Sequence, residues 1–379
     1  MKQISLFEPN ITNLEKKMVM ESLDKNQIST YGYFTNLLLK EIKKITNSKY
    51  NLATNSGSSA LFLAFKSVGV KKEEIIITQS YTFTATTNAI ILNNSIPLLL
   101  DISLDDLNLD FFKLEEFLKN ETFKNKNFTF HKKTKKKITC VCLVLTLGII
   151  PNLDQINLIR KKYNLKIVFD GACALGHKYK KNRLTKYCDA AVYSLNGNKN
   201  FTAGAGGILS TDEFKYYNFA KKFANNGKIM NAYNYKMIGF NLNMSSLNAA
   251  VGLAQMKRFN EIQKKKKKIN KSYSRMLSPI ELFNCKFSWG EYLPWMNFYI
   301  AKDKNEKKVI IDKLRKKNIL ANNFWLPMHK QPTKKNFLLT NYPNTNYIYE
   351  RIIVLPSSTF LSLNLVKKIS QIIKKTKNI

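Results

Sequence analysis

Short apolar runs alternate with amphipathic segments between Tyr50 and about Ser210. The runs are rich in β-branched and aliphatic residues and predict strands, whereas the segments between them have the spacing of helices. The predicted strands are Asn51–Ala53, Glu74–Thr78, Pro97–Leu100, Thr139–Leu147, Lys166–Phe169, Ala190–Tyr193 and Gly207–Leu209, and the predicted helices are Ser59–Val68, Tyr81–Leu92, Leu114–Lys119 and Leu153–Tyr163. Alternation of this kind is typical of βαβ units, so we expect a mainly parallel sheet that helices cover on both faces.

The chain on either side of this region has mostly helical patterns. The residues before Tyr50 read as helical, with a turn at Ser29–Gly32. After Met244, apolar residues recur at helical spacing for about 30 residues without Pro, which predicts one long helix with an exposed, lysine-rich side. The strand-like segment WMNFYIA, a helix near Lys307–Lys316 and a closing helix from Asn364 follow.

Length and pattern together predict two domains. A chain of 379 residues is too long for one simple core, since domains commonly hold about 150 residues. We expect a large domain over residues 1–256, including the N-terminal helical segment, and a smaller α+β domain over residues 257–379.

The formal net charge of +36 raises the question of a nucleic-acid or membrane partner. Among the 62 basic residues, however, Lys far outnumbers Arg, whereas planar, bidentate recognition of phosphates and bases favours Arg. No helix-turn-helix spacing, zinc pattern or aromatic-basic interleaving accompanies the charge. We therefore interpret runs such as Lys132–Lys137 and Lys264–Lys268 as solvated faces and expect no nucleic-acid partner, with a regulatory or nucleic-acid-binding protein as the alternative.

Cysteine usage and hydropathy bear on the compartment. The five cysteines are odd in number and form no CxxC, so neither a disulfide framework nor a zinc site is indicated; they are Cys140, Cys142, Cys173, Cys188 and Cys285. No apolar segment approaches the roughly 20 residues that cross a bilayer, and the start MKQISLFEPN lacks the apolar run of a signal peptide. We expect a cytoplasmic protein with no membrane partner and no metal.

The segment NSGSSALFLAF is the first with chemical potential. A strand end runs through Asn55, Ser56 and Gly57 into a helix that is expected to start near Ser59. Free backbone N–H groups, a positive helix end and two hydroxyls would suit a phosphate. Ordinary N-capping by Ser58 or Ser59 would explain the same residues.

Two more chemical groups follow later strands. Asp170 in KIVFDGACALG stands at the carboxyl end of a buried strand, where open α/β sheets present ligand-binding groups, although it could also be a structural cap. In AVYSLNGNKNFTAGAGG, the residues Ser194, Asn196 and Lys199 leave the sheet on a glycine-rich loop. This setting restricts the hydration of Lys199 and suits Schiff-base chemistry, whereas an ordinary solvated lysine is the alternative.

These groups together suit pyridoxal phosphate. The helix N-terminus would bind the phosphate, Asp170 would keep the pyridine nitrogen protonated, and Lys199 would hold the aldehyde as a Schiff base. Phe83 in QSYTFTATTNAI follows another strand, and its ring would lie on the face of the cofactor or, equally, belong to the core.

The sequence resembles the DegT/DnrJ/EryC1/StrS family of pyridoxal-phosphate-dependent sugar aminotransferases over nearly its whole length. The motifs that carry the resemblance are QISTYGYF, NSGSSAL, SYTFTATTNAI, DGACALG, YSLNGNK, GFNLNMSSLNAAVGLAQM, WLPMHKQP and VLPSSTFLS. The resemblance implies an α/β fold of type I, a homodimer with shared active sites, and amino transfer from an amino acid, by family expectation glutamate, to a nucleotide-linked keto-sugar in surface-polysaccharide or glycan synthesis. YSLNGNK, MHKQP and LPSST most resemble the branch that aminates UDP-linked 4-keto-6-deoxy-hexosamines for bacillosamine or legionaminic acid.

The resemblance also implies residue roles. Lys199 would be the cofactor lysine and proton shuttle, Asp170 the partner of the pyridinium nitrogen, and Asn241 a phosphate ligand from the second subunit. His329 would line the sugar-nucleotide entrance, although a lone histidine would also fit as a satisfied surface group. The whole cofactor-binding set is Gly57, Ser58, Ser59, Phe83, Asp170, Cys173, Ser194, Asn196, Lys199 and Asn241.

Several positions depart from the family pattern. Cys173 stands where Glu, Gln or His is usual, Gly171 replaces Ala, Asn243 stands where Arg is usual, and Ala205 interrupts a glycine-rich motif. A catalytically impaired relative and another pyridoxal-phosphate activity, such as a lyase, are therefore alternatives. The presence of Lys199 argues against the related dehydratases, in which His takes its place.

Overall fold

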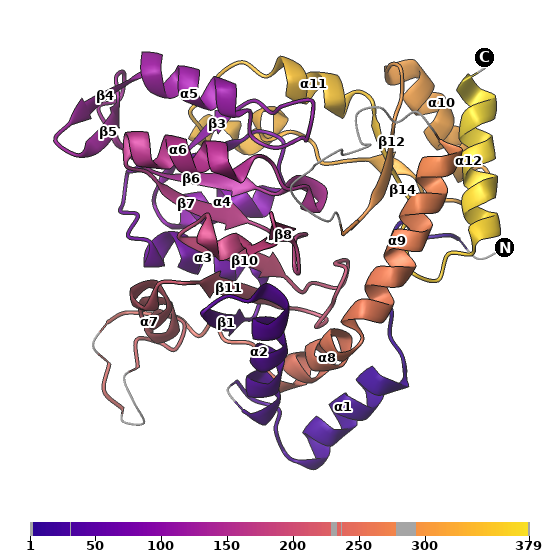
Figure 1. Ribbon diagram of the computed structural model, residues 1–379, viewed down its shortest axis with the longest axis horizontal. Helices are drawn as coiled ribbons and strands as arrows, with labels where there is room; N and C mark the ends of the chain where they lie inside the picture. The colour runs from indigo at the N-terminus through magenta and orange to yellow at the C-terminus, as the bar shows by residue number, and fades with distance from the viewer. Residues whose placement is uncertain (1–2, 31, 229–232, 236, 278–292, 378–379) are drawn as a thin grey trace.

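The computed structural model describes residues 3–30, 32–228, 233–235, 237–277 and 293–377. Within these residues, nine strands form one sheet, at the centre of the large body in Figure 1. Its main path runs β1 (Tyr50–Thr54), β11 (Gly207–Thr211), β10 (Ala190–Ser194), β7 (Lys166–Asp170), β6 (Lys137–Val144), β2 (Ile75–Gln79) and β3 (Ile96–Leu100). Strands are therefore confirmed at all seven predicted places, although β6 ends at Val144, three residues before the predicted end.

The sheet is mainly parallel. The strands from β10 to β3 pair in parallel, whereas β11 is antiparallel to both β1 and β10. A hairpin of β4 (Thr122–Asn125) and β5 (Phe128–His131) extends the sheet beside β6 and was not predicted. Its residues are mostly exposed, so no apolar run marked it as sheet.

Helices cover both faces of the sheet, because alternate strand residues point to opposite sides. Ile76 and Val168 face a core with α3 (Gly57–Ser67), α4 (Thr84–Leu92) and α7 (Phe214–Phe223). Ile77 and Ile167 face a second core. The helices that supply this second core are α2 (Tyr33–Thr46), α5 (Phe111–Asn120), α6 (Leu153–Tyr163) and α8 (Ser246–Lys257).

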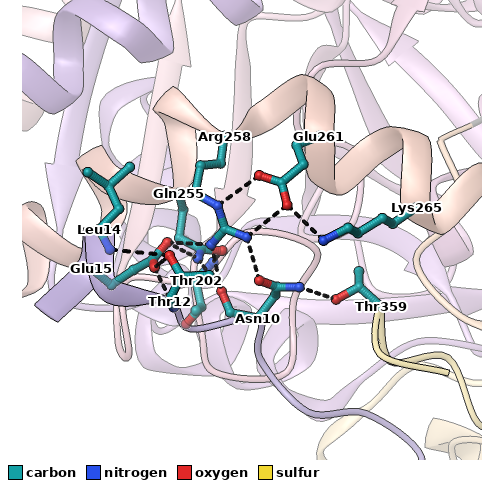
Figure 2. Close-up of polar contacts among 10 residues, drawn as sticks. All are labelled: Asn10, Thr12, Leu14, Glu15, Thr202, Gln255, Arg258, Glu261, Lys265 and Thr359. Atoms are coloured by element: carbon teal, nitrogen blue, oxygen red, sulfur yellow. Dashed lines mark hydrogen bonds and ion pairs between the residues drawn. The ribbon is translucent and has the colours of Figure 1, made fainter.

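The predicted long helix after Met244 is wrong as one element. It is two helices, α8 and α9 (Phe259–Met276), that meet at Arg258, whose backbone has left the helical region with φ −100° and ψ 12°. The Arg258 side chain reaches across to Glu15 and Asn10, near the start of the chain (Figure 2). Partners distant in sequence therefore hold the residue at which the two helices meet.

The C-terminal part forms a smaller layer. The strands β12 (Asn297–Ile300), β14 (Ile352–Leu355) and β13 (Asn322–Asn323) make an antiparallel sheet. It shares a core with α9, α10 (Lys304–Arg315) and α12 (Leu363–Lys377), on the right of Figure 1. The helix α11 (Pro343–Tyr349) precedes β14, and the short strands β8 (Lys178–Tyr179) and β9 (Asn182–Arg183) form a separate hairpin.

The N-terminal segment joins this C-terminal layer before α1 (Asn13–Asp24) begins. Ile4 pairs with Ile319, and the N–H of Glu8 donates to the Ser358 hydroxyl at 2.8 Å. The start of the chain accordingly lies on the same side of the molecule as the C-terminal layer in Figure 1. The domain boundary predicted after residue 256 stays a prediction; it falls beside the break at Arg258.

Two sequence expectations concern cysteines and membrane segments. Four cysteines lie in the described part of the chain and are buried free thiols, whereas Cys285 lies outside the described residues. None of the helices described here combines the length and the hydropathy needed to cross a bilayer.

Candidate active site

A cavity of about 280 Å³ opens where three central strands end. Val144, Asp170 and Ser194 are the last residues of β6, β7 and β10, and all three line it. In an open α/β sheet, the carboxyl ends of the parallel strands form the ligand-binding edge. The predicted residues that line this cavity are Gly57, Ser58, Phe83, Asp170, Cys173, Ser194, Asn196 and Lys199.

The start of α3 forms one wall. The helix begins at Gly57, two positions before the predicted start, and its N-cap is Ser56, whose hydroxyl accepts from the Ser59 N–H at 3.0 Å. The proposed capping by Ser58 or Ser59 is therefore wrong. Ser59 is not among the cavity-lining residues, and its hydroxyl donates to the Asn55 side chain at 2.6 Å.

Gly57 lies directly against Ser194. A Cβ atom on Gly57 would come within 3.1 Å of the Ser194 Cβ and 3.2 Å of its Oγ. The absence of a side chain therefore leaves the helix N–H groups, the Ser58 side chain and the Ser194 hydroxyl around one open space. Free N–H groups at a helix N-terminus attract an anion, so this wall fits a phosphate.

Asp170 forms the floor. It is 5% exposed, and its carboxylate accepts from the Thr86 hydroxyl at 2.7 Å and from the Ala172 N–H at 3.2 Å. Burial raises the pKa of Asp170, an effect that these hydrogen bonds and the charge of Lys199 oppose. A buried carboxylate of this kind favours a cationic partner, which a protonated pyridine nitrogen would supply.

Lys199 reaches the cavity from a tight turn after β10. Its N–H donates to the Asn196 carbonyl at 3.0 Å, which turns the chain back toward the sheet. The Lys199 Nζ donates to the Cys173 Sγ at 3.4 Å and lies 4.0 Å from the centre of the Trp295 ring. Burial raises the pKa of the Cys173 thiol.

Aromatic rings form another part of the cavity lining. Phe83 stands at the N-terminus of α4 with about half of its surface exposed, and its ring centre is 6.2 Å from that of Trp325. Trp325 is in turn 6.3 Å from Trp295. An exposed ring beside a cavity is available to stack on a planar ligand.

Three functional candidates were missed from the sequence. Thr86 lies inside the quoted motif SYTFTATTNAI, and its spacing of three after Phe83 was a usable helical signal. Trp295 and Trp325 come from the C-terminal part of the chain. No local sequence pattern predicts that this part packs beside Lys199.

Besides Ser59, two more of the predicted residues lie outside the cavity of this chain. Asn241 is exposed and pairs with Asn225. His329 is held on both ring nitrogens, by Ser80 Oγ at 2.6 Å and Asn346 Oδ1 at 3.1 Å, and stacks on Tyr342. These contacts favour the interpretation of His329 as a satisfied structural group.

Asn243, where the family pattern has Arg, is buried. Its Nδ2 donates to the Ala224 carbonyl at 2.7 Å, and the residue pairs with Thr54 at the end of β1. It therefore braces the connection between β1 and α3 rather than facing the cavity of its own chain.

The comparisons with known proteins agree with this arrangement. Residues 9–374 match the model of the DegT/DnrJ/EryC1/StrS aminotransferase family. The chain is 26% identical to the GDP-perosamine synthase of Escherichia coli O157:H7, covering 88% of this chain and 87% of that protein. It is also 26% identical to the UDP-4-amino-4,6-dideoxy-N-acetyl-beta-L-altrosamine transaminase of Helicobacter pylori, covering 99% and 98%.

Solved structures show the same fold. Helicobacter pylori PseC, an aminotransferase of pseudoaminic acid biosynthesis, superposes with a TM-score of 0.88 at 23% identity and covers 100% of both chains. The PLP-form of the putative sugar aminotransferase Spr1654 from Streptococcus pneumoniae gives 0.85 at 22% identity, with 99% of both chains covered.

Proposed function

Because the chain belongs to the DegT/DnrJ/EryC1/StrS family and is a pyridoxal-phosphate-dependent aminotransferase of fold type I, we propose that it moves an amino group from glutamate to a nucleotide-linked keto-sugar. One observation carries the proposal. The helix start at Gly57, the buried Asp170 and the Lys199 amine surround a single cavity at the carboxyl ends of the sheet.

Bound pyridoxal phosphate would supply an aldehyde that forms a Schiff base and a ring that accepts electrons from the adjacent carbon. The N–H groups at the start of α3, with Ser58 and Ser194, would bind its phosphate. Asp170 would accept the hydrogen bond of the pyridinium N–H and so keep the ring nitrogen protonated. Phe83 would cover one face of the ring.

Lys199 would serve both as tether and as proton shuttle. Its Nζ would first hold the cofactor and, once the amino donor has displaced it, would take the proton from the donor Cα. The same nitrogen would deliver that proton to the cofactor's C4′, so no water is needed as a carrier. The second half of the reaction would use these steps in reverse order with the sugar ketone.

The nature of the acceptor rests on the relatives and on the cavity mouth. The names of two relatives specify a GDP-linked and a UDP-linked amino sugar. The rings of Phe83 and Trp325 stand where an acceptor would enter, and aromatic rings suit the apolar faces of sugars and bases. Products of this class would feed surface-polysaccharide or glycan synthesis.

We further propose a cytoplasmic homodimer with shared sites. Tyr233 and Ile238 are each 90% exposed, and Phe240 is 55% exposed, directly before Asn241. Such an apolar surface is typical of a protein interface. A partner seated there would cover these side chains and could bring its Asn241 to the phosphate. A reducing compartment would keep the Cys173 thiol free.

The test begins with absorbance. Purified protein supplied with pyridoxal phosphate should be yellow, and borohydride or Lys199→Ala should abolish the visible band, whereas Lys72→Ala, at an exposed lysine, should retain it. Glutamate should then bleach the band. A colourless wild-type protein would refute the cofactor assignment. Single-turnover mass spectrometry with UDP-, GDP- and dTDP-linked keto-sugars would then identify the acceptor, and no product from any of them would refute the substrate class.

A further inference from the structure

Lys266 departs from the expected pattern of its neighbours. It lies in the lysine run of α9 that the sequence assigned to a solvated face, yet only 2% of its surface is exposed. Lys264, Lys265 and Lys268 are exposed as expected. The solvated-face prediction is therefore wrong for Lys266.

The Lys266 ammonium has three partners in this buried place. Its Nζ donates to the carbonyl of Trp295 at 2.7 Å and to the carbonyl of Ser357 at 2.8 Å. It also lies 4.4 Å from the centre of the Phe7 ring. An ammonium has three N–H donors, so two carbonyls and one ring face complete its coordination.

Burial of this charge has a cost that a methionine of similar length would avoid. Burial lowers the pKa of Lys266 to about 7, and the charge of Cys173 opposes the effect. Unlike an apolar residue, Lys266 donates hydrogen bonds to two carbonyls. One of these carbonyls belongs to Trp295, which lines the active-site cavity.

Trp295 connects Lys266 to Lys199. Its indole N–H donates to the Asn198 carbonyl at 2.7 Å, and the face of its ring lies against the Lys199 Nζ. Lys266 thus fixes the backbone of Trp295, while the loop that carries Lys199 fixes its side chain. The Lys199 amine also donates to the Cys173 Sγ.

We propose that Lys266 is a positioning residue for amino transfer, which holds the Trp295 indole in place as the docking position of the free Lys199 amine. The inference rests on the proposed function, because the amine is free only after a donor or acceptor has displaced it. The Trp295 ring and the Cys173 thiol keep the free amine beside the cavity. The amine can therefore return the proton without first moving back from a solvent-exposed position.

The first test uses cofactor-free protein and needs no activity. The chain has three Trp residues, so Trp289→Phe with Trp325→Phe leaves Trp295 as the only indole. In that background, Lys266→Met should shift the Trp295 emission and increase its quenching by acrylamide, and Lys199→Met should shift the emission as well. Lys268→Met, on the exposed side of α9, should change neither. An unchanged emission and quenching in Lys266→Met would overturn the proposal.

The second test separates positioning from folding in the otherwise wild-type enzyme. Lys266→Met should lower kcat by roughly tenfold to a hundredfold with little change in the KM for the donor, as expected when a reacting group is displaced. Trp295→Phe removes the hydrogen bond to Asn198, keeps a ring, and should cause a similar loss even if Lys266→Met folds poorly. Adding Lys266→Met to Trp295→Phe should then cost little more. If the two substitutions lower kcat by fully additive amounts, the proposal is overturned. If the proposed function is wrong, the wild-type enzyme itself will show no amino transfer.

Discussion

Arg258 and Glu15 form an ion pair with 2.9 Å between Nη1 and Oε1, and their side chains are only 9% and 2% exposed. Asn10 accepts from the same guanidinium through its backbone and side-chain oxygens, and Gln255 donates to Glu15 at 2.7 Å (Figure 2). The cluster joins the N-terminal segment to the junction of α8 and α9. Through the Gln255 side chain it also contacts the backbone of Thr202, in the loop after Lys199.

Arg258→Met should therefore be strongly destabilising, because it leaves Glu15 charged and buried without its cationic partner. We expect the free energy of unfolding to fall by about 3 kcal/mol, measured by urea denaturation. Glu261→Gln is the matched control, since Glu261 bonds the same guanidinium from an exposed position. It should cost less than about 1 kcal/mol. Equal losses in the two variants would contradict this account.

Asp170→Asn should separate stability from function. Burial raises the pKa of Asp170 above its usual value, so the folded state holds this proton more tightly than the unfolded chain does. The stability that protonated Asp170 contributes is consequently lost as pH rises from the usual carboxyl pKa through the raised one. In the cofactor-free protein, Asp170→Asn should lack this loss and be the more stable form at neutral pH, by urea denaturation from pH 4 to 8. Its kcat should fall by about 100-fold to 1000-fold, since a neutral amide cannot hold the ring nitrogen protonated. Parallel stability profiles of the two proteins would contradict the prediction.

Lys266 should give the opposite pH dependence. Its pKa is about 7 in the folded protein, against 10.5 for the ordinary side chain. Between these values the unfolded chain binds a proton that the folded one does not, so stability rises with pH. Relative to Lys266→Met, the wild type should gain up to roughly 5 kcal/mol from pH 7 to 10.5, measured by denaturation at constant ionic strength. Lys268→Met should follow the wild type throughout, and a flat difference between wild type and Lys266→Met would show that the buried amine does not titrate there.

Gly57→Ala should weaken cofactor binding. The added methyl would press on Ser194, so the hydroxyl that faces the phosphate position must move. The loss of one hydrogen bond to a charged group corresponds to about tenfold weaker affinity for pyridoxal phosphate, measurable by fluorescence titration. At Gly197 a Cβ would meet nothing closer than 3.8 Å. Gly197→Ala should thus bind the cofactor nearly as the wild type does. Equal affinities in the two variants would argue against a phosphate site between the start of α3 and Ser194.

The sequence predicted the sheet and the cavity floor well, for a physical reason. Buried parallel strands have continuous apolar runs, and chemical groups placed just after them, such as Asp170 and Lys199, necessarily meet at one edge. The break at Arg258 could not be predicted this way, because Phe259 and Ile262 continue the apolar spacing beyond it. The groups that hold the Arg258 side chain at this junction include a carboxylate 243 positions earlier in the chain.

Lys266 was misassigned because its run was interpreted by composition alone. Helical spacing places it four residues after Ile262 and three before Ile269, on the buried side of α9. What the sequence could not show is its partners, the carbonyls that the fold brings from Trp295 and Ser357. The indoles over Lys199 were missed for a similar reason, because the fold brings them from beyond residue 290 to a loop after β10.

The contact between Glu8 and Ser358 joins positions 350 residues apart. During synthesis at about 5 to 20 residues per second, the segment before α1 must therefore wait roughly 20 to 70 seconds for its partner to leave the ribosome. The nine-stranded sheet, whose last strand along the chain is β11, is complete in sequence long before that moment. The contact between the N-terminal segment and the C-terminal layer would then be among the last to form during folding. The N-terminal segment would therefore lack its partner for most of the time that the chain is being synthesised.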